Sequence, residues 1–141
     1  MDKSDSNKAR QIAQVARAFE QQTTGRLPSS VTVVLSEDTV VITLRGTLSL
    51  AEAALAKSQD GAAQLRELHR QLFTTASPPL RQEIRRITGV EVREATAEVE
   101  TSTGTVVQVF TLAQAVAADT WSGSDPGPAA AEKECVFVTA M

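Results

Sequence analysis

Apolar and polar residues alternate along two stretches of the chain, 29–48 and 90–112, and a period of three to four residues fills the region between them. Alternation is typical of strands with one buried face, and Glu37 and Asp38 divide the first stretch near its centre. This stretch therefore predicts an antiparallel hairpin whose turn fixes the register. The predicted apolar face pairs Leu35 with Val40, Val33 with Ile42 and Val31 with Leu44, and the mixed face pairs Val34 with Val41, Thr32 with Thr43 and Ser30 with Arg45.

The second stretch predicts another hairpin, with a three-residue turn at Ser102–Gly104 and glycine where positive φ is needed. In this register Val99 pairs with Val107 and Ala97 with Val109, so Phe110 and Leu112 lie on the opposite face. Either the sheet is covered on both faces, or those side chains meet a second subunit. We expect a homodimer, and the candidate dimer contact comprises Val34, Val41, Phe110 and Leu112.

Helical patterns precede and follow the first hairpin. An apolar stripe that includes Ile12 and Phe19 predicts a helix from about Asp5 to Thr23, and Gly25 suits a left-handed cap. Ser49–Glu52 has the spacing of a capping box, which predicts a second helix. A third helix follows, and Ser77-Pro78-Pro79 is predicted to end it and to start a fourth.

These elements predict an α+β fold: a four-stranded, mainly antiparallel sheet from two β-hairpins, with an N-terminal helix and a central helical segment packed on it. Residues 1–112 form the predicted domain and 113–141 a partly flexible tail, in which Cys135–Val138 is either an added strand or a docking peptide. The predicted core comprises Ile12, Val15, Phe19, Val31, Val33, Ile42, Leu44, Leu65, Leu68, Leu72, Ile84, Ile87, Val99, Val107 and Val109.

The charge of the chain is modest and uneven. The net charge is −3, so bulk charge does not favour nucleic acid. Residues 1–93 hold 13 Lys and Arg against 10 Asp and Glu, whereas residues 94–141 hold one against seven. A single cysteine, no apolar signal region and no bilayer-length apolar stretch predict a cytoplasmic protein that reaches a membrane only through a partner.

Few residues suit a catalytic or metal site. The single histidine, His69, and the single cysteine, Cys135, stand 66 positions apart, and one chain cannot fill a His/Cys zinc site. An enzyme would have to bring one of these two residues into a pocket. We therefore expect no enzyme activity, no metal and no cofactor.

One cluster of side chains supports a functional hypothesis. Arg66, His69 and Arg70 recur at helical spacing, and Arg81 and Arg85 share a face further along. Arginines four residues apart repel weakly, so an anionic ligand, the Glu-rich strand or a partner is expected to offset them. The alternative is a solvated helix face with glutamates as neighbours.

Several motifs together carry a family resemblance. They are Thr24-Gly25-Arg26-Leu27-Pro28, Gly46-Thr47-Leu48-Ser49-Leu50-Ala51-Glu52, Gly89-Val90-Glu91-Val92, Thr103-Gly104 and Val109-Phe110-Thr111-Leu112. Over residues 10–112 the chain resembles the small bacterial MpsC-like family, which is associated with a sodium-translocating, membrane-potential-generating system linked to inorganic carbon supply. The resemblance implies a non-catalytic accessory or regulatory subunit that binds a protein of an ion-translocating or carbon-uptake membrane complex. The alternative from the residues is a small-anion sensor for bicarbonate or phosphate that uses the Arg/His helix face.

Overall fold

The computed structural model describes residues 3–116 and 136–140, in which three helices pack with one five-stranded sheet. This confirms the α+β class. In chain order the elements are α1 (Lys3–Thr24), β1 (Ser30–Ser36), β2 (Thr39–Arg45), α2 (Leu50–Leu55), α3 (Gln59–Thr88), β3 (Val92–Glu100), β4 (Thr105–Leu112) and β5 (Val136–Ala140).

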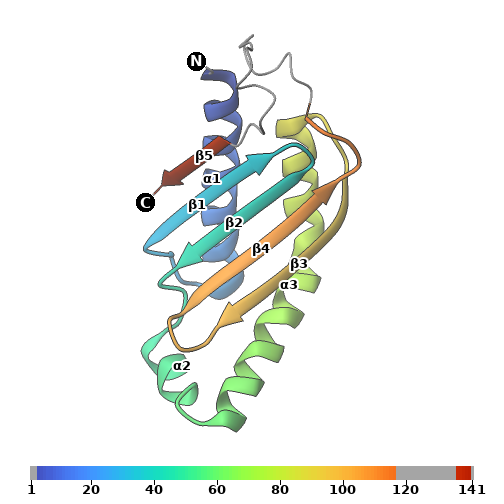
Figure 1. Cartoon of the computed structure of the whole chain (residues 1–141). Coiled ribbons are helices and arrows are strands. Elements are labelled where there is room, and N and C mark those ends of the chain that lie inside the picture. The colour runs from blue at the N-terminus through green and yellow to red at the C-terminus, as the bar shows by residue number, and fades with distance from the viewer. Residues whose placement is uncertain (1–2, 117–135, 141) are drawn as a thin grey trace.

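The strand order of the sheet is β3-β4-β2-β1-β5, and every neighbouring pair is antiparallel (Figure 1). The two hairpins meet through β2 and β4, and β5 adds to the outer edge of β1. Val136–Ala140 is therefore an added strand, one of the two alternatives that its apolar pattern allowed. Residues 117–135 lie outside the described residues, so the division into a domain 1–112 and a tail 113–141 stays a prediction.

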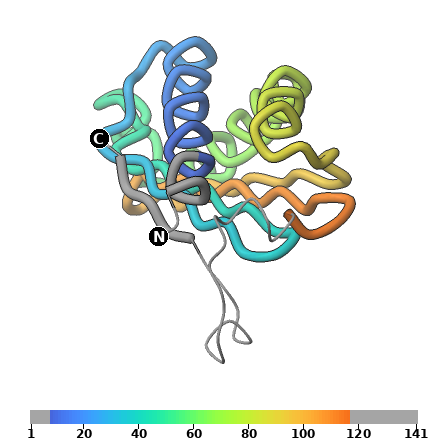
Figure 2. Tube along the Cα trace, turned by 90° about the horizontal axis from the view of Figure 1, so that it is seen from above, coloured from blue at the N-terminus to red at the C-terminus, as the bar shows by residue number. Residues whose placement is uncertain are grey.

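The two long helices lie on the same face of the sheet (Figure 2). Helix α1 packs on β1, β2 and β5, and α3 packs on β3 and on α1. The helices run in opposite directions (Figure 1). The start of α1 thus lies beside the end of α3, where the Lys8 ammonium donates to the Ile87 carbonyl oxygen at 3.4 Å. Neither long helix covers the other face of the sheet.

The first hairpin has the register that the alternation predicts. Every predicted pair is present, from Ser30 opposite Arg45 to Leu35 opposite Val40. Glu37 adopts a φ of 53°, the left-handed conformation that a two-residue hairpin turn requires. The apolar face forms the centre of the core, and none of its side chains is more than 1% exposed: Val31, Val33, Leu35, Val40, Ile42 and Leu44.

The second hairpin is present, but its predicted register is wrong by one residue. Val99 pairs with Val106 because the turn holds four residues, Thr101–Gly104, rather than three. Gly104 has the expected positive φ, 75°. Its carbonyl oxygen accepts hydrogen bonds from the backbone N–H and the hydroxyl of buried Thr47, at 3.1 and 2.9 Å. This contact with a distant segment holds the wider turn in place.

A shift of one residue exchanges the two faces of β4. Phe110 and Leu112, expected to contact a second copy, are only 0% and 1% exposed and belong to the core of this chain. Val107 and Val109, expected in the core, lie on the opposite face, and Val107 is 36% exposed. The predicted dimer contact through Phe110 and Leu112 is therefore wrong.

The central helix is one element, and the predicted stop at Pro78 is also wrong. Helix α3 continues for 30 residues with Pro78 and Pro79 inside it, although each proline removes a backbone donor. Leu65 before the prolines and Leu80 after them are both buried, so continuous packing of this helix offsets the cost. Leu68, expected in the core, is 45% exposed because its side of α3 is turned away from the packed layers.

The short helix α2 begins as the sequence predicts. The Ser49 hydroxyl accepts a hydrogen bond from the Glu52 backbone N–H at 3.1 Å, and Glu52 Oε1 accepts one from the Ser49 backbone N–H at 2.8 Å. This capping box also orients Glu52. Its second oxygen, Oε2, lies 3.7 Å from Nε2 of His69 on α3.

Candidate functional site

A small cavity with both polar and apolar walls lies between α1, α3 and the sheet. Its volume of about 30 Å³ has room for roughly two water molecules. Its walls come from four elements, α1, α3, β3 and β4. The lining residues are Phe19, Glu20, Thr23, Thr24, His69, Leu72, Phe73, Ala76, Ala97, Glu98, Val106 and Gln108.

Glu20 is the buried acid of this cavity. It lies one turn after Ala16 and two turns after Ile12, so the helical period places it on the buried stripe of α1, and it is 7% exposed. Its Oε2 accepts no hydrogen bond, and no Lys or Arg of the described residues forms an ion pair with it. Burial, and secondly the Glu52 carboxylate, raise the pKa of Glu20 to about 7.

His69 enters the same cavity from α3. Its side chain is 10% exposed, and the 3.7 Å between its Nε2 and Glu52 Oε2 is too long for a hydrogen bond. Burial lowers the pKa of His69 below its ordinary value, although the Glu52 carboxylate opposes that shift. The lowered pKa disfavours the imidazolium form, so His69 is poorly suited to supply the positive charge that an anion site would need.

Gln108 reaches the cavity from β4. The register of the second hairpin turns it inward, where it is 5% exposed and its Oε1 accepts no hydrogen bond. The ring of Phe110, also on β4, lies 6.0 Å from the ring of Phe73, which lines the cavity. A buried polar atom without a hydrogen bond lowers the stability of the fold. The cavity therefore interrupts the otherwise apolar packing between the helices and the sheet.

The sequence predicted a role for His69 but did not identify Glu20 and Gln108, which line the same cavity. The available signal for Glu20 was its position, since a charged residue continued the stripe of Ile12 and Ala16. Gln108 gave no signal, because its burial depends on the turn that Thr47 holds.

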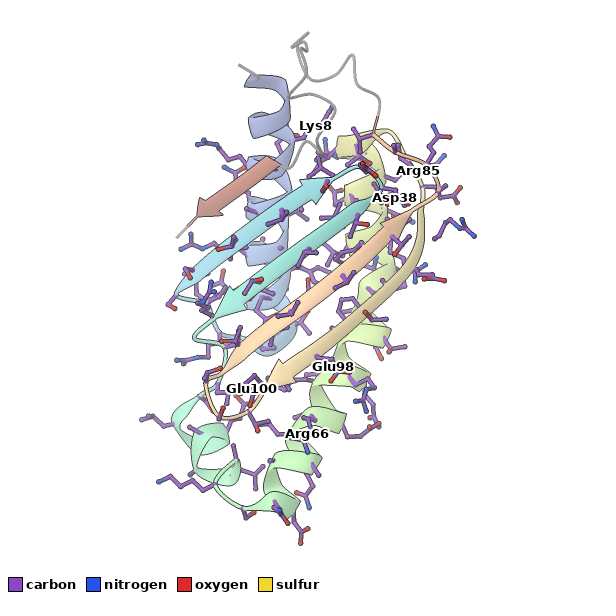
Figure 3. All side chains as sticks on the ribbon, viewed as in Figure 1. Lys8, Asp38, Arg66, Arg85, Glu98 and Glu100 are labelled. Atoms are coloured by element: carbon purple, nitrogen blue, oxygen red, sulfur yellow. The ribbon has the colours of Figure 1, made fainter. Side chains whose placement is uncertain are left out.

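The arginines predicted to share an anion site do not converge. Arg66 and Arg85 lie near opposite ends of α3 (Figure 3), about 28 Å apart at the helical rise. Arg70 already pairs with two glutamates of the chain, at 2.8 and 3.6 Å. Within the described part of the chain, Arg81 and Arg85 pair with no carboxylate. The anion-sensing alternative therefore stays a prediction, and none of these arginines lines the cavity.

Comparison with known proteins assigns the family. A family model described as "Na+-translocating membrane potential-generating system (MpsC)" matches residues 4–114. The chain belongs to the MpsC family. It is similar to "Uncharacterized protein YbcI" of Bacillus subtilis (strain 168), with 27% identity over 112 residues, which are 79% of this chain and 90% of that protein. No solved structure matches it.

The region shared with the MpsC family includes every residue that lines the cavity. It also includes β1 to β4, four of the five strands that form the side of the sheet that the long helices leave uncovered. Across the structure from 3–116 and 136–140, no helix has the length and apolar character needed to cross a membrane. The same residues contain no group of three or more His, Cys, Asp or Glu side chains suited to a metal ion.

That uncovered side of the sheet is apolar at its centre in this MpsC-family chain. Val34, Val41 and Val109 are direct neighbours across β1, β2 and β4, and Val107 lies opposite Thr43. These four valines, called the open face below, range from half-buried to exposed. Val34 and Val41 thus keep the accessible position predicted for them, now beside Val107 and Val109.

Proposed function

We propose that this chain is a non-catalytic accessory subunit that binds another protein of a Na+-translocating, membrane-potential-generating system. Family membership supports the choice of system. The open face supports binding, and it is the observation that carries the proposal. Three valines adjoin one another across three neighbouring strands, and neither long helix lies over them.

An exposed apolar patch on a sheet gains free energy when a partner covers it, at about 25 cal/mol per Å² of apolar area. Exposed apolar patches mark protein–protein or membrane contact sites and ligand-binding grooves. The cavity between α1 and α3 is, by contrast, about 30 Å³, far below the several hundred Å³ of ordinary substrate pockets. Nε2 of His69 has no hydrogen-bond partner among the described residues. The proposed binding role therefore rests on the open face and not on this cavity.

The open face also suits a second copy of this chain, the homodimer that the sequence predicts through Val34 and Val41. The arginines of α3 lie on the helical side, so they form a separate candidate surface. An experiment on the open face therefore has to distinguish a membrane partner from self-association.

The test places a negative charge on the open face. Val107→Glu alters the most exposed of its four valines, and Gln64→Glu on the exposed side of α3 is the matched control. Each full-length variant replaces the wild-type protein in its native host, and a voltage-sensitive dye reports the Na+-dependent potential of inverted membrane vesicles. We expect Val107→Glu to lose most of that potential and Gln64→Glu to retain it.

Two further measurements make the result decisive. Thermal unfolding shows whether both variants are folded, and light scattering gives their mass in solution. A wild-type dimer that Val107→Glu dissociates, with an unchanged potential, would replace the accessory-subunit proposal by self-association. An unchanged potential in cells that lack the chain altogether would refute it.

A further inference from the structure

The cavity between α1 and α3 contains polar atoms that the described structure leaves unsatisfied. They are Glu20 Oε2, Gln108 Oε1 and His69 Nε2, one from each of three elements. Glu20 and Gln108 are only 7% and 5% exposed, so bulk water does not satisfy them. Buried polar atoms nearly always have a partner, and a bound species inside the cavity is the partner that the geometry allows.

The charges around the cavity determine the sign of that species. The Glu52 carboxylate on α2 lies 3.7 Å from His69 and its charge acts on Glu20, and Glu98 on β3 lines the cavity. Arg70 pairs with Glu98 at 3.6 Å, whereas no Lys or Arg of the described residues pairs with Glu20. A buried carboxylate without a counter-charge attracts a cation or holds a proton, and it repels an anion.

The size of the cavity limits which cations it can hold. A volume of about 30 Å³ excludes organic cations of more than a few atoms. Mg²⁺ usually keeps several waters in an octahedral shell and Ca²⁺ takes six to eight oxygen ligands, and a space with room for about two waters is too small for either shell. The unsatisfied atoms are a carboxylate oxygen, an amide oxygen and a ring nitrogen, all of which can act as acceptors. These features suit a small monovalent ion.

We propose that this cavity binds a small monovalent cation, held by the Glu20 carboxylate and the Gln108 amide oxygen with His69 as a third contact. Na⁺, K⁺ and NH₄⁺ share the required charge and size, and the experiment separates them. The site is distinct from the open face, so it does not depend on the proposed accessory role. Its test uses the purified chain alone and no membrane.

Thermal unfolding of the full-length protein tests the site. The measurement is made at about pH 8, where Glu20 is mostly ionised. N-methylglucamine chloride, whose cation is too large for the cavity, keeps the ionic strength constant while NaCl, KCl or NH₄Cl replaces it. We expect at least one small cation to raise the melting temperature progressively. At about 100 times its dissociation constant, that cation shifts the unfolding equilibrium about 100-fold toward the folded state.

Two variants locate the effect. Glu20→Gln keeps the size of the side chain but removes its charge, and it should abolish the selective shift. Glu67→Gln removes an exposed carboxylate of α3 outside the cavity, and it should leave the shift unchanged. Equal melting temperatures in all four chloride salts, or the same selective shift in Glu20→Gln, would overturn the proposal.

Sodium-23 NMR of the wild-type protein gives a measurement that does not depend on any variant. Excess line broadening that K⁺ or NH₄⁺ removes supports the site. Absence of this broadening, combined with no selective change in melting temperature for any of the three ions, means that the cavity holds water only and rules out a cation site.

Discussion

Ionisation of Glu20 should weaken the fold as the pH rises, and Glu20→Gln should remove this weakness. The pKa of Glu20 is raised from 4.5 to about 7 in the folded chain, chiefly because the carboxyl is buried. The folded state therefore holds this proton more tightly than the unfolded state does. The resulting stabilisation is complete below about pH 4.5, declines as the pH rises toward 7, and is lost above about pH 7.

The size of the effect follows from the shift. A change of one pKa unit corresponds to about 1.4 kcal/mol, so the shift to about 7 is equivalent to about 3 kcal/mol. Solvent screening reduces this little, because Glu20 is only 7% exposed. Domains of this size are typically stable by about 5–15 kcal/mol, so the effect is a large fraction of the total. Between about pH 5 and pH 8, Glu20→Gln should gain about 2–3 kcal/mol relative to wild type.

Urea unfolding followed by circular dichroism measures this difference. The buffers contain N-methylglucamine as the cation, because a small cation in the cavity would offset the charge of Glu20. His69 acts in the opposite direction: its lowered pKa gives stability that is present above its ordinary pKa and is lost as the pH falls. That contribution is present in both proteins, so the comparison isolates Glu20. Stability curves of wild type and Glu20→Gln that stay parallel from about pH 5 to pH 8 would refute the reasoning.

Two other predictions concern packing and capping. Phe110→Ala should lower the free energy of unfolding by about 3–5 kcal/mol because the ring is 0% exposed. Leu68→Ala, at a site 45% exposed, should lower it by less than about 1 kcal/mol. Urea unfolding measures both losses, and a larger loss for Leu68→Ala would contradict the observed register. Ser49→Ala should lower the free energy of unfolding by about 1 kcal/mol because it removes the cap of α2. Ser49→Asp should keep most of the stability, since aspartate also caps helices. Equal melting temperatures for Ser49→Ala and wild type would count against the capping box.

The two hairpins show how much of a strand register the local sequence pattern can predict. Alternation and a short turn were enough to predict every pair of the first hairpin, including Ser30 with Arg45, because its register depends only on residues next to one another in sequence. The second hairpin depends on a hydrogen bond between Thr47 and Gly104, which are 57 positions apart. No pattern within β3 or β4 contains that information, so both the register and the burial of Phe110 were predicted wrongly.

The central helix also shows that local sequence signals do not decide the structure by themselves. Pro78 and Pro79 are reliable local signals against a helix, and they predicted a break. The structure retains the helix because Leu65 and Leu80, on either side of the prolines, both pack into buried positions. Tertiary burial therefore outweighed a local preference that was identified correctly.

The surroundings of the cavity include a capping box that the sequence predicts, but the effect of this capping box on Glu20 and His69 is not visible in the sequence. The capping box of Ser49 and Glu52 was predicted from spacing alone, and in the structure it uses Glu52 Oε1. Because that oxygen is fixed by the cap, Oε2 is directed toward His69, at 3.7 Å, and the negative charge of Glu52 also raises the pKa of Glu20. A local motif that starts a six-residue helix thus influences the electrostatics of a cavity between two other helices. The motif was visible in the sequence, but its effect depends on α1, α2 and α3 meeting at one place, which only the folded chain determines.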